Sequence, residues 1–563
     1  QCSNKQNHIR ELVVAKTMDY MRRWTDIKDE RSTYFGHWEE LSEFILPRRG
    51  RFLTSKRNDG SKKNGKIIDS TGTMAVRTLS AGMMSGITSP ARPWFRLATP
   101  DSALMEQSEV KQWLYSVEKK MREIFSRSNL YNSLQTVYEE LSVFGTGAML
   151  VSEDFDDVIR CYPFTVGEYG LAQSHRLQVD TFYREFQLTV AQVVEQFGME
   201  NCSDPVQSMF KEGKLDSYVE ILHVVEPNSV RQYDKKDNQN MPYHSCYIEK
   251  ASKNERKLSD KGFEEFPVLA PRWHVTGVDI YGRSPGMDVL GDVKALQIEQ
   301  KRKAQGIDKM VNPPLQAPSS LRGQSATVLP GGVTYVDTMQ GNQGGFRPTY
   351  EVNPRLGELQ QDIAETQYRI QQGFYADLFQ MMTQSDRRQI TAREIDERHE
   401  EKLLMLGPVL ERLHTELLNP LIDRTFNIMA RNDLLPPAPE ELGGVTLKVE
   451  YISVMAQAQK AIGTGAIERL AGFVGNMAAT KPDVLDKFDA DQSVDEYAEM
   501  LGVPPKIVVP DDVVQQMRQA RQEQMEQQQM MEQASMGAQA AKVMSDADTG
   551  GENILTDIIG GIS

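Results

Sequence analysis

The sequence has few cysteines and histidines, and none of them is spaced as metal ligands usually are. Its four cysteines are Cys2, Cys161, Cys202 and Cys246. No two of them form a Cys-x-x-Cys pair, so we expect reduced structural thiols in a cytoplasmic protein. The eight histidines are equally dispersed, and we therefore expect no metal site. His223 and His274 lie in apolar, strand-like runs, where a histidine usually belongs to the core.

Long hydrophobic runs are also absent from the chain. No window approaches 18 consecutive apolar residues, and the first ten residues are polar. We therefore expect neither a membrane span nor a secretory signal. Hydrophobic residues make up 39% and charged residues 25% of the 563 residues, which is typical of a globular protein with several domains.

The chain has no excess of positive charge: 64 Lys and Arg stand against 79 Asp and Glu, a formal net charge of −15. A protein that grips duplex DNA is usually basic, because its affinity comes from neutralising phosphates and releasing counterions. This balance argues against a tight duplex binder. It is compatible with a protein past which DNA slides, where strong phosphate contacts would act as a brake.

Complete catalytic motifs are missing too. Residues 60–67 nearly match the phosphate-binding loop of nucleotide hydrolases, but Ile67 stands where Mg²⁺ needs a Ser or Thr hydroxyl. The preceding residues 54–59 are polar rather than a buried strand. His399 and Glu400 begin like a zinc protease helix, yet no second histidine follows. We therefore expect no enzyme, no cofactor and no catalytic residue.

A basic loop runs from Pro47 to Lys66 and contains a single acid, Asp59. Its basic residues are Arg48, Arg49, Arg51, Lys56, Arg57, Lys62, Lys63 and Lys66. Such a run contacts DNA phosphates or a partner protein at close range, or it is simply a solvated loop. The sequence leaves these alternatives open.

The first half of the chain has helices followed by strands. Helical spacing predicts helices over residues 8–45, from Asp69-Ser70-Thr71 to about Met84, and over 106–144 with a break near Asn129. From residue 145 to residue 274 the pattern has period two, with strands such as 181–188. A capping box at Thr189 predicts a short helix that Gly198 ends. Gly145-Thr146-Gly147 is most simply a turn.

Two helices bracket an insert in the middle of the chain. The first covers Asp288 to Met310 and is broken at Asn312-Pro313-Pro314, and the second runs from Pro354 to about Gln380. At 1.5 Å per residue they measure roughly 35 and 40 Å, so they can pack antiparallel. Their apolar stripes are narrow. Such a hairpin is poorly buried alone and well buried beside identical neighbours in a ring.

The rest of the chain is mainly helical. A polar loop at 381–389 precedes a capping box at Thr391 and a long helix to about Met429, which Pro408 and Pro420 should kink. After a Pro-rich linker we expect a strand at 445–451. Further helices are expected at 456–479, 494–501 and 511–544, and a mobile tail after them.

A set of short segments is shared with one protein family. They are Phe44–Gly50, Asp69–Thr71, Leu79–Phe95, Phe144–Gly147, Tyr281–Pro285, Asn312–Pro314 and Thr391–Leu406. The run Ser-Gly-Ile-Thr-Ser-Pro-Ala-Arg-Pro-Trp-Phe, which ends at Phe95, is the specific one. This set resembles the portal, or head-to-tail connector, proteins of short-tailed bacteriophages, and the likeness covers roughly residues 30 to 460.

The resemblance implies an α+β, predominantly helical portal fold that assembles as a dodecameric ring around a channel. Its parts would be a wing (1–284), a first stem helix (285–310), a β-containing clip (311–353), a second stem helix (354–380), a tunnel loop (381–390), a long kinked wing helix (391–434), a helical crown (435–510) and a C-terminal helix with a mobile tail (511–563), with or without a barrel. Tunnel-loop residues expected to face DNA are Thr383, Gln384, Ser385, Arg387 and Arg388.

The resemblance also implies the function and the partners. A portal forms the channel for DNA packaging and ejection at one capsid vertex, and it has no enzymatic activity. Its partners would be non-specific double-stranded DNA, the terminase large subunit, tail adaptor and head-completion proteins, and the major capsid and scaffolding proteins. It would be a virion component assembled in the host cytoplasm. The rival interpretations are a tail adaptor or scaffold, and a packaging ATPase or nuclease.

Overall fold

The structure is a computed structural model that describes residues 2–47, 49–51, 65–101, 104–105, 107–235, 237–250, 257–316, 347–348, 355–379, 406–442, 447–452, 467–501, 507–509 and 511–546. The chain divides into two compact units. The first comprises Gln1–Arg96, Val117–Pro436 and Val449–Gln459, and the second comprises Leu97–Ser116, Pro437–Lys448 and Lys460–Ser563.

The helices predicted in the first part of the chain are present. They are α1 (Cys2–Phe44), α2 (Thr71–Ile87), α4 (Ser108–Arg127) and α5 (Leu130–Phe144). The predicted break near Asn129 separates α4 from α5. Ser70 precedes α2 but makes no side-chain capping bond. Asp69 takes that role instead, since its Oδ1 accepts a hydrogen bond of 2.8 Å from the Thr71 backbone N–H.

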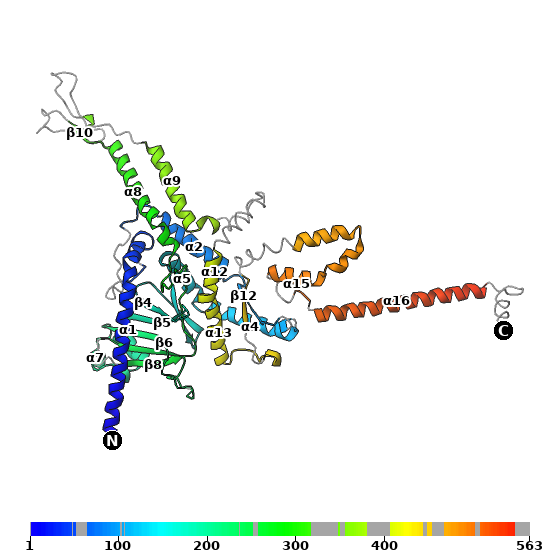
Figure 1. Ribbon diagram of the computed structural model, residues 1–563, viewed down its shortest axis with the longest axis horizontal. Coiled ribbons are helices and arrows are strands. Elements are labelled where there is room, and N and C mark those ends of the chain that lie inside the picture. Colours follow the sequence, from blue (N-terminus) through cyan, green and yellow to red (C-terminus); the bar gives the residue numbers. More distant parts are fainter. Residues whose placement is uncertain are drawn as a thin grey trace, which may run out of the picture. The chain divides into compact units, whose positions relative to one another are not determined.

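A five-stranded antiparallel sheet forms the centre of the first unit (Figure 1). Its strands are β4 (Tyr169–Gln173), β5 (Val179–Thr189), β6 (Tyr218–Pro227), β7 (Tyr243–Glu249) and β8 (Lys257–Phe263), in that order. Helix α1 lies on one face, where Trp24 and Ile27 pack against Tyr183 and Leu222. The period-two pattern therefore predicted this block correctly.

The opposite face of the sheet is covered by short helices. They are α6 (Val190–Phe197), η1 (Met199–Asn201) and α7 (Asp204–Lys211). The predicted capping box is present: the Gln192 N–H donates to Thr189 Oγ1 at 3.3 Å, and the Thr189 N–H donates to Gln192 Oε1 at 3.0 Å. Gly198 ends α6 with a φ of 81°, as expected, because glycine adopts a positive φ more easily than other residues.

A second sheet, with strand order β3-β2-β9, follows the turn after α5. Its strands are β2 (Ala148–Asp154), β3 (Val158–Phe164) and β9 (Val268–Leu269). Strand β1 (Phe95–Ala98) is not part of this sheet. The predicted turn at Gly145 is confirmed by its φ of 78°. A Cβ at Gly145 would lie 2.3 Å from the Gly282 carbonyl oxygen, so only glycine fits there.

The two histidines that we expected in the core differ in burial. His223 is buried in β6 and hydrogen-bonds Ser245 Oγ at 3.1 Å, and burial lowers its pKa to about 3. The prediction for His274 is wrong, because this side chain is exposed. His274 lies in the connection between β9 and the next helix, where a single bridge to Arg283 replaces a strand pair.

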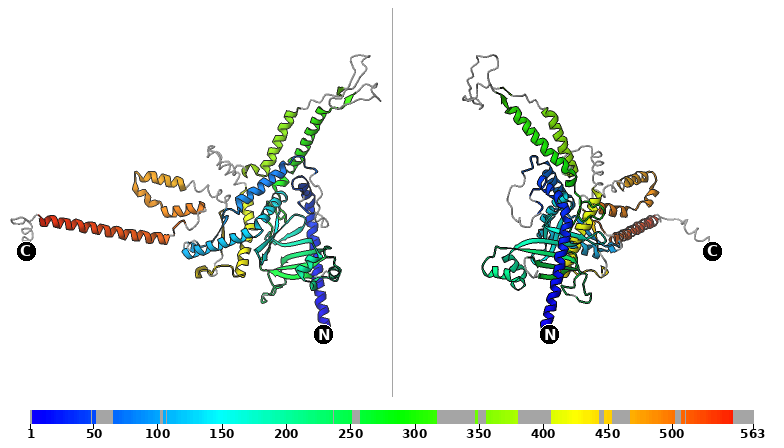
Figure 2. Two further views of the ribbon diagram at one scale, coloured as in Figure 1. Left: turned by 180° about the vertical axis from the view of Figure 1, so that it is seen from behind. Right: turned by 60° about the vertical axis from the view of Figure 1, so that its left-hand side comes forward.

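The predicted helical hairpin consists of α8 (Pro285–Val311) and α9 (Leu356–Gly373), which lie side by side in each view (Figures 1 and 2). At the far end, β10 (Leu315–Gln316) pairs antiparallel with β11 (Arg347–Pro348). The prediction of one helix to Gln380 is wrong. Helix α9 ends at Gly373, Tyr375 has φ 54°, and residues 376–379 are helical again. This turn lets Phe374, Leu378 and Phe379 all be buried, which a straight half-exposed helix would not allow.

The described part of the predicted long helix is helical without a break from Gly407 to Arg431, and residues 391–405 lie outside the described residues. It consists of α12 (Gly407–Leu413), the π-helical η3 (His414–Leu418) and α13 (Asn419–Arg431). Pro408 lies in the first turn of α12, where a missing N–H costs little, rather than at a kink. The helix widens at η3, directly before Pro420. This wider turn accommodates the proline, which has no N–H to donate to the helix. The short η4 (Glu440–Leu442) and β12 (Lys448–Tyr451) follow.

The second unit is largely helical in its described part. Residues 467–478 form a helix, followed by η5 (Pro482–Lys487), α15 (Ala490–Leu501) and α16 (Asp511–Asp546). One ion pair between Arg518 and Asp491, with two hydrogen bonds of 2.7 and 2.8 Å, connects α16 with α15. The helices predicted at 494–501 and 511–544 are confirmed.

Candidate functional site at the base of the helical hairpin

The α8–α9 hairpin is buried at its base and exposes apolar residues farther out. Val293 and Leu296 of α8 and Ile370 of α9 are buried. Along α8 and just after it, the apolar side chains at least 41% exposed are Ile298, Ile307, Met310, Val311 and Leu315, and Tyr368 of α9, nearer the base, is 56% exposed. A row of exposed apolar side chains on a projecting hairpin indicates a surface that other protein covers.

One carboxylate, Asp69, connects both helices of the hairpin with the start of α2. Its Oδ2 accepts hydrogen bonds from Gln300 Nε2 of α8 at 2.8 Å and from Gln367 Nε2 of α9 at 2.9 Å. Burial opposes ionisation of Asp69, but the bonds from Thr71, Gln367 and Gln300 outweigh it and lower the pKa. The ionised carboxylate therefore holds three helices together at one point.

The neighbouring backbone is fixed by the buried amide of Gln297. Its Oε1 accepts from the Ile68 and Asp69 N–H groups at 2.6 and 2.8 Å, and its Nε2 donates to the Asp69 carbonyl at 3.1 Å. Every polar atom of this side chain thus has a partner in segment 68–69. Since buried amides are costly when unpaired, this arrangement fixes the position of α8 against the start of α2.

Glycines allow the helices at this base to approach closely. A Cβ at Gly373 of α9 would lie 2.2 Å from Val289 Cγ1 of α8. A Cβ at Gly82 of α2 would lie 2.2 Å from the Phe379 ring. One face of α2 is buried, including Ala75 and Gly82, so the close approach of Phe379 lies in the interior of the unit.

The N-terminus of α8 is anchored as well. Ser284 Oγ accepts from the Met287 N–H at 3.1 Å and donates to the Val143 carbonyl at 2.6 Å, which connects α8 with α5. On the α1 side, Lys294 and Glu40 form an ion pair of 2.6 Å. Sequence patterns predicted the helices of this base but not these long-range bonds. Local patterns do not contain the identity of a partner that lies far away in the sequence.

The basic residues near the two ends of the basic loop are paired with carboxylates. Three of its predicted contact residues lie in the described part of the chain: Arg49 pairs with Glu139 at 2.8 Å, Arg51 with Glu168 at 3.2 Å and Lys66 with Glu43 at 2.6 Å. These three therefore hold the loop to the unit. The others, Arg48, Lys56, Arg57, Lys62 and Lys63, lie outside the described residues.

A wholly buried carboxylate, Glu140, lies near Arg49 at the same end of the basic loop. It accepts from Thr165 Oγ1 at 2.8 Å and from the Val166 N–H at 3.2 Å, and Arg49 Nη1 lies 3.9 Å away. Burial raises the pKa of Glu140 to about 7, although Arg49 and these two hydrogen bonds oppose the rise. The group therefore titrates near neutral pH.

The predicted tunnel loop lies outside the described residues. This applies to Thr383, Gln384, Ser385, Arg387 and Arg388, to the capping box at Thr391 and to most of the predicted clip. Residues 311–316 and 347–348 of the clip are described, and β10 and β11 pair there beyond the C-terminal end of α8.

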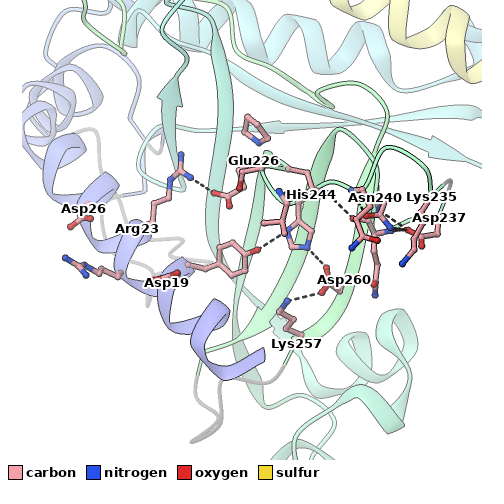
Figure 3. A pocket seen from close by; sticks show the side chains of 18 residues that line it. Asp19, Arg23, Asp26, Glu226, Lys235, Asp237, Asn240, His244, Lys257 and Asp260 are labelled. Carbon is pink, nitrogen blue, oxygen red and sulfur yellow. Dashed lines mark hydrogen bonds and ion pairs between the residues drawn. The ribbon is translucent and has the colours of Figure 1, made fainter. Parts of the chain in front are cut away.

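A cavity of about 690 Å³ between α1 and the β6–β8 end of the sheet is lined mainly by polar side chains (Figure 3). Tyr20 Oη lies 3.1 Å from His244 Nδ1, and Asp260 is bonded to both His244 and Lys257. Burial opposes ionisation of Asp260, but these two partners lower its pKa to about 2. Burial also raises the pKa of Tyr20, so the phenol keeps its proton and no nucleophile is formed. These contacts fasten α1 to the sheet.

Cys161, Cys202 and Cys246 are buried thiols. Among the described residues, no group of three or more His, Cys, Asp or Glu side chains is arranged to hold a metal ion. The helices of that part include none with the length and apolar character needed to cross a membrane.

Comparisons with known proteins point to one family. A family model described as "Bacteriophage head to tail connecting protein" matches residues 17–508. The "Portal protein" of Salmonella phage epsilon15 is 50% identical over 539 residues, which cover 96% of this chain and 97% of that protein. The "Probable portal protein" of Bordetella phage BPP-1 is 47% identical over 538 residues with the same coverage.

A solved structure, the "Neck of empty GTA particle computed with C6 symmetry", has a TM-score of 0.28 at 10% identity, covering 57% of this chain and 70% of that chain. The family model spans most of the chain, and both curated relatives match nearly its whole length. The chain therefore belongs to the bacteriophage head-to-tail connecting protein family.

Proposed function

We propose that the chain is the portal subunit of a tailed bacteriophage, and that copies of it form a closed ring through which DNA enters and leaves the capsid. The observation that carries this proposal is the α8–α9 hairpin, which has a tightly bonded base and exposed apolar side chains farther out. Identical hairpins side by side would bury those side chains, and a closed ring leaves no hairpin uncovered. The family is a structural component of the virion, not an enzyme.

The segments of the chain have distinct roles in this proposal. Residues 1–284 form the wing, α8 and α9 the stem, 311–353 the clip, 381–390 the tunnel loop, 391–434 the kinked wing helix and 435–510 the crown. The clip binds the terminase large subunit during packaging and tail adaptor or head-completion proteins afterwards. The wing meets the major capsid and scaffolding proteins during assembly in the host cytoplasm.

Charge keeps the DNA mobile in the channel. A ring of twelve would carry a formal charge of −180, twelve times −15, so acids facing the lumen repel phosphate and keep the duplex centred. Arg387 and Arg388 of the tunnel loop give weak, screened contacts that retain DNA without locking it.

The long helix α16 contributes to assembly of the crown. Its described side chains are largely exposed, including Met517, Met525, Met530, Met531 and Met536. Exposed methionines along one helix favour self-association, because their flexible thioethers adapt to many apolar surfaces. In a ring, neighbouring α16 helices would pack into a barrel.

Charge reversal tests the role of the tunnel loop. We expect Arg387→Glu with Arg388→Glu to leave ring formation intact and to lower the amount of DNA retained in filled heads. The measurement is DNA per particle after packaging. A matched control is Lys211→Glu with Lys214→Glu, which changes the charge equally on the exposed surface around α7. Equal DNA retention in both variants would exclude the tunnel-loop contact.

A further inference from the structure

Strand β5 extends beyond its neighbour β4 and leaves part of one edge without a partner strand. The pairing of β4 with β5 begins at Tyr169, which lies opposite Arg184. One further backbone bond follows, from the Glu185 N–H to the Glu168 carbonyl at 3.3 Å. Among the described residues, no strand lies beside residues 186–188 on this edge of the sheet.

Gln187 directs its backbone N–H and C=O toward this open edge. The Glu185 N–H points toward β4, and backbone groups two residues apart in a strand point to the same side. On the other side Gln187 lies opposite Glu220, whose carbonyl accepts from the Lys250 N–H of the next strand at 3.1 Å. In the described part of the chain, no hydrogen bond reaches the Gln187 backbone. Such an edge can accept an added extended segment.

A cavity of about 1060 Å³ lies along this open edge. Gln187 lines it, together with the aromatic side chains of Phe35, Tyr162, Phe186 and Tyr247. Its volume is at the upper end of the range of ligand pockets, and such pockets combine apolar walls with a few polar groups that fix the ligand. The cavity therefore suits a ligand with apolar side chains rather than a small ion.

The same cavity contains a buried arginine. Arg31 of α1 is 5% exposed, and its guanidinium lies 5.2 Å from the Trp24 ring centroid and 4.9 Å from that of Phe35. Its Nη1 donates to the Tyr169 carbonyl at the start of β4. Within the described residues, Nε has no hydrogen-bond partner and no ion pair involves this guanidinium. A buried charge without a counter-ion is costly, so Arg31 favours the binding of a carboxylate.

The other charges of the cavity limit what it can bind. Four Lys or Arg side chains and three Asp or Glu side chains line it. Glu185 is bonded to Lys250 Nζ, Glu168 pairs with Arg51 at 3.2 Å, and Asp29 is exposed. A nucleic acid would bring many phosphates close to these three acids, whereas a single carboxylate needs only one cation.

The two faces of β5 determine which side chains an added strand would carry. Glu185 faces α1, where Trp24 Nε1 donates to it at 2.9 Å, so Gln187 faces α1 too. Phe186 and Leu188 face the other way, against the cluster formed with α6 and α7. Directly opposite residues of paired strands share a face. The residue opposite Gln187 would thus point to the side of α1 and Arg31, and its two neighbours would point to the apolar side.

The edge strands of this chain do not supply such a segment. In the described part, β3, β4 and β9 at the edges of the two larger sheets contain no acidic residue. The remaining edge strand, β8, carries Lys257 and Lys261, and its Asp260 is already bonded to His244 and Lys257. The occupant therefore differs from the edge strands that a second copy would offer.

We propose that this cavity binds an extended segment of a partner protein, with alternating acidic and apolar residues, which adds to the edge of β5 at Gln187 and places a carboxylate on Arg31. Two main-chain hydrogen bonds to Gln187 hold the segment, and its apolar side chains lie on Phe186 and Leu188. This binding site goes beyond the proposed function and does not depend on ring formation.

Titration with a synthetic peptide tests the proposal on the full-length, assembled chain. The probe is fluorescein-labelled Val-Glu-Val-Glu-Val-Glu-Val, and the same peptide with Gln in place of Glu is its control. Fluorescence anisotropy should show that the Glu peptide binds roughly tenfold more tightly, because a charged hydrogen-bond partner is lost in the control. Arg31→Gln should remove this difference.

A second pair of variants tests the backbone contact. Gln187→Pro removes the N–H that faces the open edge, where the sheet itself loses no bond, and should weaken binding of both peptides several-fold. Gln187→Ala, the matched control, keeps the backbone and should bind as the wild type does. Thermal unfolding shows whether each variant folds. If Arg31→Gln does not, the two peptides on the wild type and the Gln187 pair still decide.

Four results would overturn the proposal. They are equal affinity of the wild type for both peptides, wild-type affinity in Gln187→Pro, displacement of the peptide by equimolar inorganic phosphate or duplex DNA, and binding to dissociated subunits but not to the assembled chain. The last would show that a neighbouring copy fills the cavity. Ring formation is measured separately, so the proposed function can fail without this inference.

Discussion

Glu140 shows how a single side chain couples the fold to pH. Its carboxylate is wholly buried, and burial raises its pKa from 4.5 to about 7. Between these two values the folded chain keeps a proton that the unfolded chain releases. The contribution of Glu140 to stability is therefore largest below the unfolded pKa and falls as the pH rises toward about 7, by at most about 3 kcal/mol.

We predict that Glu140→Gln flattens this dependence, because glutamine cannot ionise. The unfolding midpoint of the wild-type chain should fall between pH 5 and pH 7, and that of the variant should change much less. Thermal unfolding at pH 5, 6, 7 and 8 measures this. The control is Glu139→Gln, which removes the adjacent, partly exposed partner of Arg49 and should keep the wild-type slope. Equal slopes in Glu140→Gln and wild type would contradict the assignment.

At the scale of helices, the close contact between α8 and α9 depends on glycine. Gly373 faces Val289, whereas a Cβ at Gly357 of the same helix would meet no neighbouring atom within 4 Å. The same substitution at the two sites therefore has opposite consequences. One overpacks the hairpin base, and the other removes an entropic cost of glycine in a helix.

We predict that Gly373→Ala destabilises the chain by about 1–3 kcal/mol, as overpacking of a tight contact does. Gly357→Ala, the matched control, should be neutral or stabilise by roughly 0.5–1 kcal/mol. Denaturant midpoints of the two variants, measured side by side, provide the comparison. Should Gly373→Ala be as stable as Gly357→Ala, α8 and α9 do not approach as closely as described.

Local patterns predicted much of the element order. The capping box at Thr189 and the Asn312-Pro313-Pro314 break each act within a few residues, so periodicity and turn chemistry were enough to place the boundaries. The end of α9 at Gly373 was missed, because it depends on burial of Phe374 and Phe379 against other elements. The same applies to Asp69, whose partners Gln300 and Gln367 lie 231 and 298 residues away.

At the scale of the whole molecule, a single subunit exposes apolar surfaces that neighbouring subunits would cover. The exposed apolar side chains of α8 and α9 and the methionines of α16 are left in water by a single subunit. Burying such surfaces stabilises an assembly by roughly 25 cal/mol per Å² of apolar area. The chain should therefore form a closed oligomer, and its family membership provides the context of a head-to-tail connector.

Cryo-electron microscopy of the purified, assembled chain would show whether its subunits close into a ring. We predict closed rings with a central channel, in which α8 and α9 of adjacent subunits pack side by side around the axis. A stable monomer at high concentration, or an assembly in which the α8–α9 hairpins point outward without neighbours, would contradict it.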